Sequence, residues 1–234
     1  IVGIPVIEGP WGWNPSAVSA HANMGVVYDY YKNVLGLNSF DGNGAPIAVA
    51  VDYNPLGPVL GYFSKYDNAY WDANTNELVF GDGGDLEGAL DIVGHEYTHA
   101  VVSYVVGQGN TVWESGESGA LNEAYADILG SLIEGKTGPD RWLMGEDSTF
   151  GGGALRSLAD PTLFDTPYGP YRDNYASRYT GTEDQGGVHG NSTIFSHAAY
   201  LMMTDPATSG ITDDTWATVF YHSLYRLGPN ATFS

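Results

Sequence analysis

The sequence predicts an α+β fold: an antiparallel sheet with a free edge strand lies over a central helix that carries two histidines, and a mainly α-helical lobe follows. Alternating apolar residues over 46–53 and a hairpin pattern over 68–80 predict the sheet. The central helix is expected over 88–106. Helical periodicity then recurs over 119–134, 193–204 and 213–227. We therefore expect an amino-terminal lobe of residues 1–106, a carboxy-terminal lobe of residues 107–234, and a cleft between them.

The composition is that of a globular chain with a sizeable core. The chain has 234 residues, of which 43% are hydrophobic and 13% aromatic, enough for one large domain or two smaller lobes. Its formal charge of −20, from 28 acidic and 8 basic residues, argues against nucleic acid or an anionic membrane as a partner. So many carboxylates either form a solvated acidic surface or need counter-cations, for which calcium is the first candidate.

Cysteine content and hydropathy bear on the compartment and on processing. The chain contains no cysteine, which excludes a disulfide framework and a cysteine-based zinc site. No stretch approaches the length of a membrane span, and Ile1 does not open a signal peptide, so we expect a mature or trimmed protein. Many glycines and tyrosines beside few lysines are typical of a secreted hydrolase.

The amino-terminal elements follow from local patterns. Prolines interrupt residues 1–15, which predicts an extended or looped start, and Ser16 is a candidate cap for a helix over 17–35. The hairpin over 68–80 combines aromatic strand residues with a turn at D-A-N-T-N. Its free edge is compatible with two roles, an ordinary sheet edge or a strand that pairs with an extended peptide.

The central helix carries the segment D-I-V-G-H-E-Y-T-H-A over residues 91–100. His95 and His99 are four residues apart, which places both imidazoles on one helix face, one turn apart. Neutral imidazoles in that arrangement are suited to binding zinc. Glu96 projects beside the metal, where a carboxylate can accept a proton from a water on the metal. The pattern H-E-x-x-H therefore indicates a catalytic zinc site.

A second apolar helix, over 119–134, carries Glu123 and Asp127 one turn apart. Buried carboxylates are unfavourable unless they are paired or bind a metal. Glu123 is therefore the natural third zinc ligand. Asp127 can accept a hydrogen bond from the free ring nitrogen of a zinc-bound histidine and so fix its tautomer.

A further group of acidic residues predicts calcium beside the zinc site. Glu134 lies eleven residues after Glu123, which returns it to within about 20° of the same helix face. Asp91 lies one turn before the first histidine of the central helix, and Asp140 and Glu146 follow in an acidic segment. Oxygen atoms from these residues are the kind of ligand that calcium prefers, so we expect them to converge on a calcium ion.

A histidine after two glycines marks the last functional segment. In D-Q-G-G-V-H-G-N the glycines predict a tight turn that presents His189. Asn191 or Ser192 is a candidate cap for the helix that follows. Residues 160–179, which are rich in proline, tyrosine and aspartate, are expected to form an irregular loop.

These motifs together resemble the thermolysin-like neutral metalloproteases, the M4 family of gluzincins. The matching blocks occur in the family's order between about residue 28 and residue 225. They are Y-D-Y-Y-K-N-V, N-A-Y-W, V-F-G-D-G, D-I-V-G-H-E-Y-T-H-A-V, E-S-G-A-L-N-E-A-Y-A-D, G-E-D, L-R-S-L-A-D-P and Y-T-G-T-E-D-Q-G-G-V-H-G-N-S. The resemblance implies a thermolysin-like fold and a secreted, monomeric zinc endopeptidase that acts on polypeptides and carries structural calcium.

Applied residue by residue, the resemblance implies the composition of the metal sites. The implied zinc ligands are His95, His99 and Glu123. The implied calcium ligands are Asp91, Glu134, Asp140 and Glu146. Glu96 would be the general base, and Asp127 would support a zinc-bound histidine. His189, oriented by Asp184, would stabilise the oxyanion of the tetrahedral intermediate.

The resemblance also implies how a peptide would bind. Asn68 and Ala69 would hold the substrate backbone along the hairpin edge. The residues implied for the pocket that receives the residue after the scissile bond are Arg156, Ile92, Met144 and Leu155. That pocket implies cleavage on the amino side of bulky hydrophobic residues.

The sequence departs from the family pattern in several places. The loop over 107–116 is longer, and Trp113 is the nearest candidate for the substrate-contacting tyrosine that the family carries there. Leu143 stands where the family has a further calcium-binding glutamate, so we expect a single calcium ion rather than a pair. Residues 151–153 lack the acid of another calcium loop. Both ends are shorter than in the family, as expected for a compact relative or a trimmed fragment.

Two other functions compete with the endopeptidase. One is a catalytically silent or fragmentary binding module on the same scaffold, which the shortened ends favour and the intact ligand set opposes. The other is a gluzincin aminopeptidase, which needs a site for a free amine, and the sequence shows no motif for one. The sequence therefore favours a zinc-dependent metalloendopeptidase.

Overall fold

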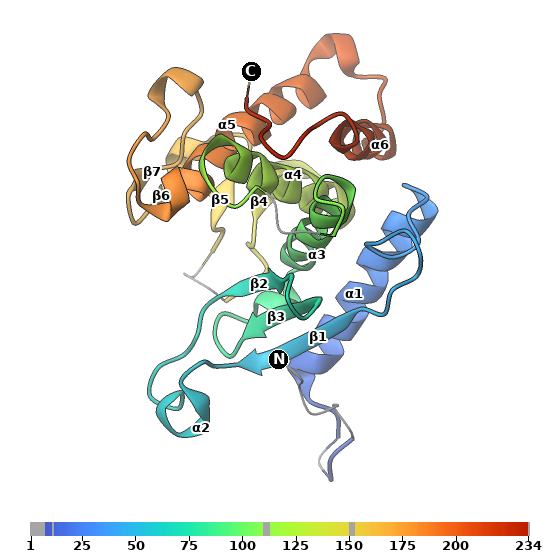
Figure 1. Cartoon of the computed structure of the whole chain (residues 1–234), viewed down its shortest axis with the longest axis vertical. Helices are drawn as coiled ribbons and strands as arrows, with labels where there is room; N and C mark the ends of the chain where they lie inside the picture. The colour runs from blue at the N-terminus through green and yellow to red at the C-terminus, as the bar shows by residue number, and fades with distance from the viewer. Residues whose placement is uncertain (1–7, 11, 110–112, 150–152, 234) are drawn as a thin grey trace.

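The computed structural model describes residues 8–10, 12–109, 113–149 and 153–233. Much of the expected extended start and of the segment 151–153 lies outside these residues. Within them the fold is α+β, as the sequence predicts. Figure 1 shows α3 (Leu90–Val105) in the middle of the molecule, with the sheet on one side and the carboxy-terminal helices on the other.

The main sheet has three strands in the order β1-β3-β2. β2 (Ala69–Asp72) and β3 (Glu77–Gly81) form the expected antiparallel hairpin, with Ala69 opposite Phe80. β1 (Ala48–Tyr53) runs parallel to β3, so the sheet is mixed rather than antiparallel. The reason is the order in which the strands form along the chain. After β1 the chain first forms β2 at the far edge of the sheet, and it then returns as β3 between β1 and β2. β2 is therefore an edge strand, as predicted.

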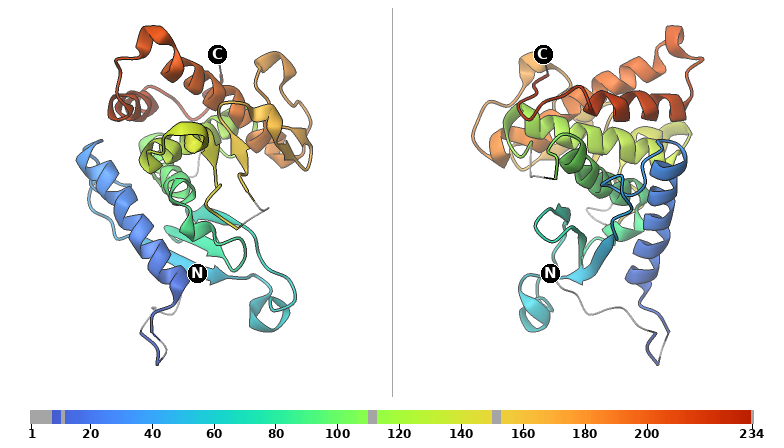
Figure 2. Two further views of the ribbon diagram at one scale, coloured as in Figure 1. Left: turned by 180° about the vertical axis from the view of Figure 1, so that it is seen from behind. Right: turned by 45° about the vertical axis from the view of Figure 1, so that its right-hand side comes forward.

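The first helix, α1 (Pro15–Asn33), packs on the sheet side of the molecule, as the two views in Figure 2 show. Its cap is Asn14, whose side chain accepts from the Ala17 backbone N–H at 3.1 Å. Ser16 is not the cap, because its hydroxyl donates to Asp52 at 3.0 Å. The sequence therefore predicted this helix correctly and its capping residue wrongly.

The helices α3 and α4 (Gly116–Glu134) form the centre of the core, and both are buried along most of their length. Two glycines allow their backbones to come close. A Cβ atom on Gly130 would lie 2.5 Å from the Asp91 carbonyl oxygen, and one on Gly94 would lie 3.1 Å from the Gly130 Cα. This close packing brings the polar residues of α3 against those of α4.

The carboxy-terminal part adds α5 (Asp184–Thr204) and α6 (Asp213–Leu224). α5 opens on a left-handed turn, because Gln185, Gly186 and Gly187 take positive φ values of 48°, 92° and 81°. The predicted glycine turn is therefore present, and the regular helix follows it, earlier than the predicted start at residue 193. His189 therefore lies directly after this turn, in the first regular turn of α5. Asn191 lies inside the helix, where its side chain accepts from the Tyr179 backbone N–H instead of capping.

Short elements complete the described chain. They are α2 (Gly57–Leu60), β4 (Leu143–Met144), β5 (Arg156–Ser157), β6 (Asp165–Thr166), β7 (Gly169–Pro170) and the 3-10 helices Leu86–Gly88, Gly138–Trp142, Pro161–Leu163, Tyr175–Ser177 and Pro206–Thr208. The pair β6–β7 forms a small hairpin within the segment that the sequence predicted to be an irregular loop. None of the described helices combines the length and hydropathy that crossing a membrane requires.

Candidate active site

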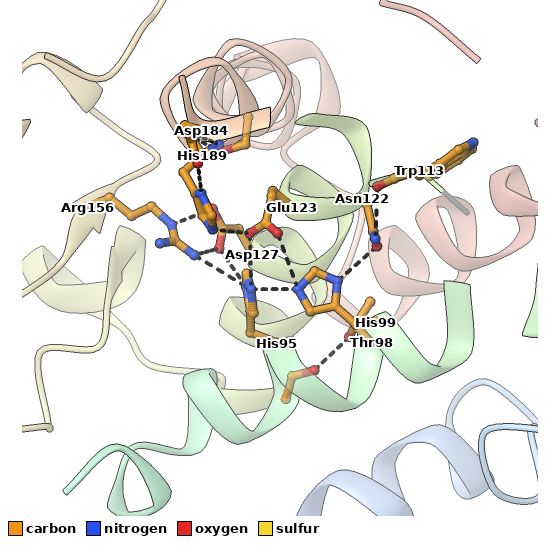
Figure 3. A network of polar contacts seen from close by, with 12 residues as sticks. His95, Thr98, His99, Trp113, Asn122, Glu123, Asp127, Arg156, Asp184 and His189 are labelled. Atoms are coloured by element: carbon orange, nitrogen blue, oxygen red, sulfur yellow. Dashed lines mark hydrogen bonds and ion pairs between the residues drawn. The ribbon is translucent and has the colours of Figure 1, made fainter. Parts of the chain in front are cut away.

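His95, His99 and Glu123 direct one ligand atom each at a common point between α3 and α4 (Figure 3). The two histidine Nε2 atoms are 3.0 Å apart, and they lie 3.4 Å and 3.6 Å from the two carboxylate oxygens of Glu123. Ligand atoms of a tetrahedral zinc site, with bonds of about 2.0–2.1 Å, are about 3.3 Å from one another. The three residues therefore fit a zinc ion.

Asp127 orients the first histidine. Its Oδ1 lies 2.9 Å from His95 Nδ1, which leaves His95 Nε2 free to face the metal site. Asp127 is fully buried and also accepts two hydrogen bonds from Arg156, from Nε at 2.8 Å and from the terminal nitrogen at 2.5 Å. The sequence predicts that Asp127 pairs with one of the two histidines, and the structure shows the contact with His95. The bidentate pairing of Asp127 with Arg156 was not predicted.

The second histidine has a partner that sequence reasoning missed. His99 Nδ1 contacts Asn122 Oδ1 at 2.9 Å, and the Asn122 amide donates to the Trp113 carbonyl oxygen at 3.4 Å. The amide therefore presents its oxygen to His99, which sets the tautomer that leaves Nε2 for the metal. The indole of Trp113 is 3% exposed and donates to the Gly228 carbonyl at 2.9 Å, so the polar atom of this side chain is not available to a substrate.

The carboxylates around the two histidines make the site strongly attractive to a cation. Burial opposes protonation of His95, but hydrogen bonds with Asp127 and Glu123 outweigh burial and raise its pKa to about 10. Burial also opposes ionisation of Glu123, whereas the neighbouring His189 and His99 hold the pKa of its carboxyl well below the usual range. The negative charge that favours a proton on His95 equally favours a divalent metal that displaces it.

Glu96 lies beside the metal site in the wall of a cleft. A cavity of about 540 Å³ on one side and one of about 780 Å³ on the other are both lined by Glu96 and His95. Since Glu123 and His189 also line both, the two cavities are the two arms of one cleft that meet at the metal site. Glu96 itself is 7% exposed, so its carboxylate is shielded from bulk water yet borders both arms.

His189 faces the metal site from α5, with its Nε2 3.7 Å from Glu123 Oε2. The predicted pairing with Asp184 is present: Asp184 Oδ1 lies 2.6 Å from His189 Nδ1, and Oδ2 accepts the His189 backbone N–H at 2.9 Å. The charge of Glu123 and the contact with Asp184 raise the pKa of His189 although burial lowers it. This shift favours an imidazolium that donates from both ring nitrogens.

The residues expected at the substrate pocket divide into two groups. Ile92, Leu155 and Arg156, three of the residues predicted for the substrate pocket, line the smaller arm of the cleft. Met144 is fully buried in the core and does not line either arm. It acts instead through its backbone, because it pairs with Arg156 between β4 and β5 and its carbonyl accepts the Leu155 N–H at 2.8 Å.

The edge strand β2 borders the same cleft. Asn68 and Ala69 line both arms, and Tyr70 and Trp71 continue along the larger arm. The Asn68 carbonyl is occupied, because it accepts the Gly81 N–H at 2.8 Å within the sheet. Among the residues that the structure describes, β2 pairs with β3 on one side only, and its other edge borders the cleft.

A second group of carboxylates, the acidic cluster, lies where α3 and the end of α4 meet the chain near Glu146. Ligand atoms of Asp91, Glu134 and Glu146 lie within 4.8 Å of one another, which fits a calcium ion. Burial, with the charges of neighbouring carboxylates, raises the pKa of Asp91 to about 6 and that of Glu134 to about 7. Asp140 is exposed in the 3-10 helix after α4 and lies outside the group, whereas Lys136, which sequence reasoning did not consider, lies inside it.

Known proteins resemble this chain along most of its length. Residues 7–103 match the family model described as "Thermolysin metallopeptidase, catalytic domain", and residues 113–234 match the model described as "Thermolysin metallopeptidase, alpha-helical domain". A thermolysin of Alicyclobacillus acidocaldarius is 42% identical over 238 residues, which cover 95% of this chain and 40% of the relative. A bacillolysin of Brevibacillus brevis is 42% identical over 233 residues, with 94% and 40% covered.

A solved structure shares the fold. The precursor of protealysin, a metalloproteinase from Serratia proteamaculans, superposes with a TM-score of 0.75 at 29% sequence identity. The match covers 94% of this chain and 69% of that one. The chain therefore has a thermolysin-like fold, and it spans about 40% of the length of the curated relatives that it matches.

Proposed function

The chain belongs to the thermolysin metallopeptidase family, and from that premise we propose that it is a zinc-dependent endopeptidase. The observation that carries the proposal is the convergence of His95, His99 and Glu123 on one point in a cleft, with Glu96 beside it and His189 facing it. The proposed substrates are polypeptides cleaved on the amino side of bulky hydrophobic residues. We further propose a secreted monomer with one structural calcium ion and with lobes 1–106 and 107–234 on either side of the cleft.

His95 Nε2, His99 Nε2 and the Glu123 carboxylate would hold the zinc. When bound, zinc lowers the pKa of a water molecule and polarises the scissile carbonyl. Glu96 then accepts the proton of the attacking water and delivers it to the leaving amine, since its carboxylate borders both arms of the cleft. The buried pairing of Asp127 with Arg156 keeps His95 in the orientation that this requires.

His189 would stabilise the negative charge that develops on the substrate oxygen. Its Nδ1–H donates to Asp184, which fixes the ring and leaves the Nε2–H directed into the cleft. An imidazolium in this position matches an oxyanion better than a neutral carbonyl, so the contact strengthens as the tetrahedral intermediate forms.

The substrate would lie along the open edge of β2, with its backbone paired by addition of a strand. Ile92 and Leu155 give the smaller arm an apolar wall next to the metal site. An apolar side chain that follows the scissile bond is removed from water in that arm, which favours large hydrophobic residues. The guanidinium of Arg156 reaches the same arm while it remains paired with Asp127.

Hydrolysis of a protein substrate tests the proposal directly. Purified protein loaded with zinc should cleave casein, lose the activity in a chelator and regain it when zinc is restored. Sequencing of the products should show internal cleavage, with Leu, Phe or Ile at most of the new amino termini. Release of single amino-terminal residues would indicate an aminopeptidase, and zinc binding without cleavage would indicate a binding module.

Replacing His189 by alanine should lower kcat by about 10²-fold and leave the zinc content at one ion per chain. The loss follows because the developing oxyanion loses a hydrogen-bond donor, whereas none of the proposed zinc ligands changes. Steady-state kinetics with a peptide substrate and metal analysis of the same sample measure the two quantities. Loss of zinc from the variant would show that His189 holds the metal instead.

A further inference from the structure

The acidic cluster contains a cation of its own. The Lys136 ammonium lies 2.5 Å from Glu146 Oε1, 2.8 Å from Asp147 Oδ2 and 3.2 Å from Glu134 Oε1. Its side chain is 26% exposed, whereas those of Glu134 and Glu146 are only 5% and 11% exposed. Lys136 therefore reaches from the surface into a group of largely buried carboxylates.

The positive charge of one ammonium does not neutralise the acidic cluster. Asp91, Glu134 and Glu146 together carry three negative charges when ionised, and Lys136 supplies one positive charge. Burial without compensation is unfavourable for a carboxylate, so the remaining charge calls for a second cation.

Buried carboxylate oxygens that lack a hydrogen-bond partner indicate where that second cation fits. Both carboxylate oxygens of Glu134 and Oε2 of Glu146 are buried and have no hydrogen-bond partner among the described residues. Lys136 donates a hydrogen bond to Glu146 Oε1 and makes only an ion pair with Glu134 Oε1. Asp91 is held nearby by the backbone N–H groups of Ile92 and Gly145, at 2.8 Å and 2.5 Å. Besides their contacts with the ammonium, the three carboxylates have ligand atoms within 4.8 Å of one another, a spacing that fits a calcium ion.

We infer that Lys136 is a tethered cation that fills one of two adjacent cation positions in the acidic cluster and limits the cluster to a single divalent ion. The ammonium repels a second divalent ion and at the same time holds Glu134 and Glu146 together when calcium is scarce. Lys136 is joined to α4 through Gly135 alone, so its ammonium need not be captured from solution. The inference does not depend on the peptidase activity.

The experiment compares Lys136→Met with a matched control, Lys65→Met, whose lysine pairs with one carboxylate, Asp82, at 3.3 Å. All proteins carry Glu96→Gln, so that self-cleavage cannot obscure the melting curves, and all are loaded with one equivalent of zinc. Calcium-free melting temperatures are expected to fall by about 5 °C for Lys136→Met and by less than about 1 °C for the control. Equal melting temperatures for the two variants would overturn the inference.

Calcium binding gives the second readout. Calorimetric titration should find one calcium ion bound to the cluster of the parent protein. That ion is identified by its absence from the same titration of a Glu134→Gln variant. Lys136→Met should bind either a second ion there or the same ion at least about tenfold more tightly, because a positive charge has left the site. Two calcium ions bound to the cluster of the parent protein would overturn the inference. The titration of the parent protein does not depend on whether Lys136→Met folds.

Discussion

Glu96→Gln is expected to reduce kcat/KM for peptide hydrolysis by about 10³-fold while one zinc ion per chain remains bound. Glutamine has the shape of glutamate but cannot accept the proton of the attacking water. The residue is 7% exposed and lies on α3 next to His95, so the change leaves the three proposed ligands and the packing of the helix in place. Steady-state kinetics on a peptide with leucine after the scissile bond, together with metal analysis, measure both quantities.

Two further variants test whether the loss of activity is due to the loss of Glu96 as the general base. Glu96→Asp keeps the carboxylate and withdraws it by one methylene, so its activity should lie between those of the parent and the glutamine variant. Glu87→Gln changes a glutamate that is equally buried, at 5% exposed, and does not line either arm of the cleft. It should retain nearly all activity. Activity close to that of the parent in Glu96→Gln would exclude Glu96 as the general base.

The parts of the site that sequence reasoning predicted lie on regular helices. His95 and His99 share a face of α3 because four residues complete about one turn, and the same arithmetic relates Glu123 to Asp127 on α4. A buried carboxylate requires a partner, and this requirement predicted that Glu123 and Asp127 face the histidines of α3. These are local rules, and the structure brings the four side chains together as they require.

The contact of Asn122 with His99 could be predicted from the sequence. A metal-bound histidine needs a partner for its second ring nitrogen, and this rule holds for His99 as well as for His95. Asn122 precedes Glu123 directly on α4, so its side chain was a candidate for His99. The contact of Trp113 with Gly228 had no such signal, since the two residues are far apart in the sequence and meet only through the tertiary fold.

The arrangement of the acidic cluster could not be predicted from helical periodicity alone. Gly135 ends α4 with a φ of 66°, and this left-handed residue turns the chain so that Lys136 points back at the carboxylates. The same change of direction carries Asp140 away into an exposed 3-10 turn. Neither position follows from helical periodicity, because the helix has already ended. By contrast, the two glycines before His189 predicted a turn from local backbone preference, and Gln185, Gly186 and Gly187 form it with positive φ values.

Asp127→Ala is expected to destabilise the fold by about 3–5 kcal/mol and to weaken zinc binding by about 10- to 100-fold. Asp127 is fully buried and accepts two hydrogen bonds from Arg156 and one from His95. Its loss leaves the Arg156 charge buried at 7% exposed without a counter-ion, and it leaves His95 Nδ1 without an acceptor. Urea unfolding of zinc-free protein measures the first effect, and competition with a chelator measures the second.

A double variant separates the two effects. Asp127→Ala with Arg156→Met removes the unpaired charge, so it should recover much of the lost stability, since a pair of apolar residues can replace a buried ion pair at little cost. Zinc affinity should stay low, because His95 still lacks its acceptor. Asp173→Asn, a change at an exposed aspartate, is the control and should alter neither quantity. If the double variant regained full zinc affinity, Asp127 would act on the metal site only by neutralising Arg156, and not by orienting His95.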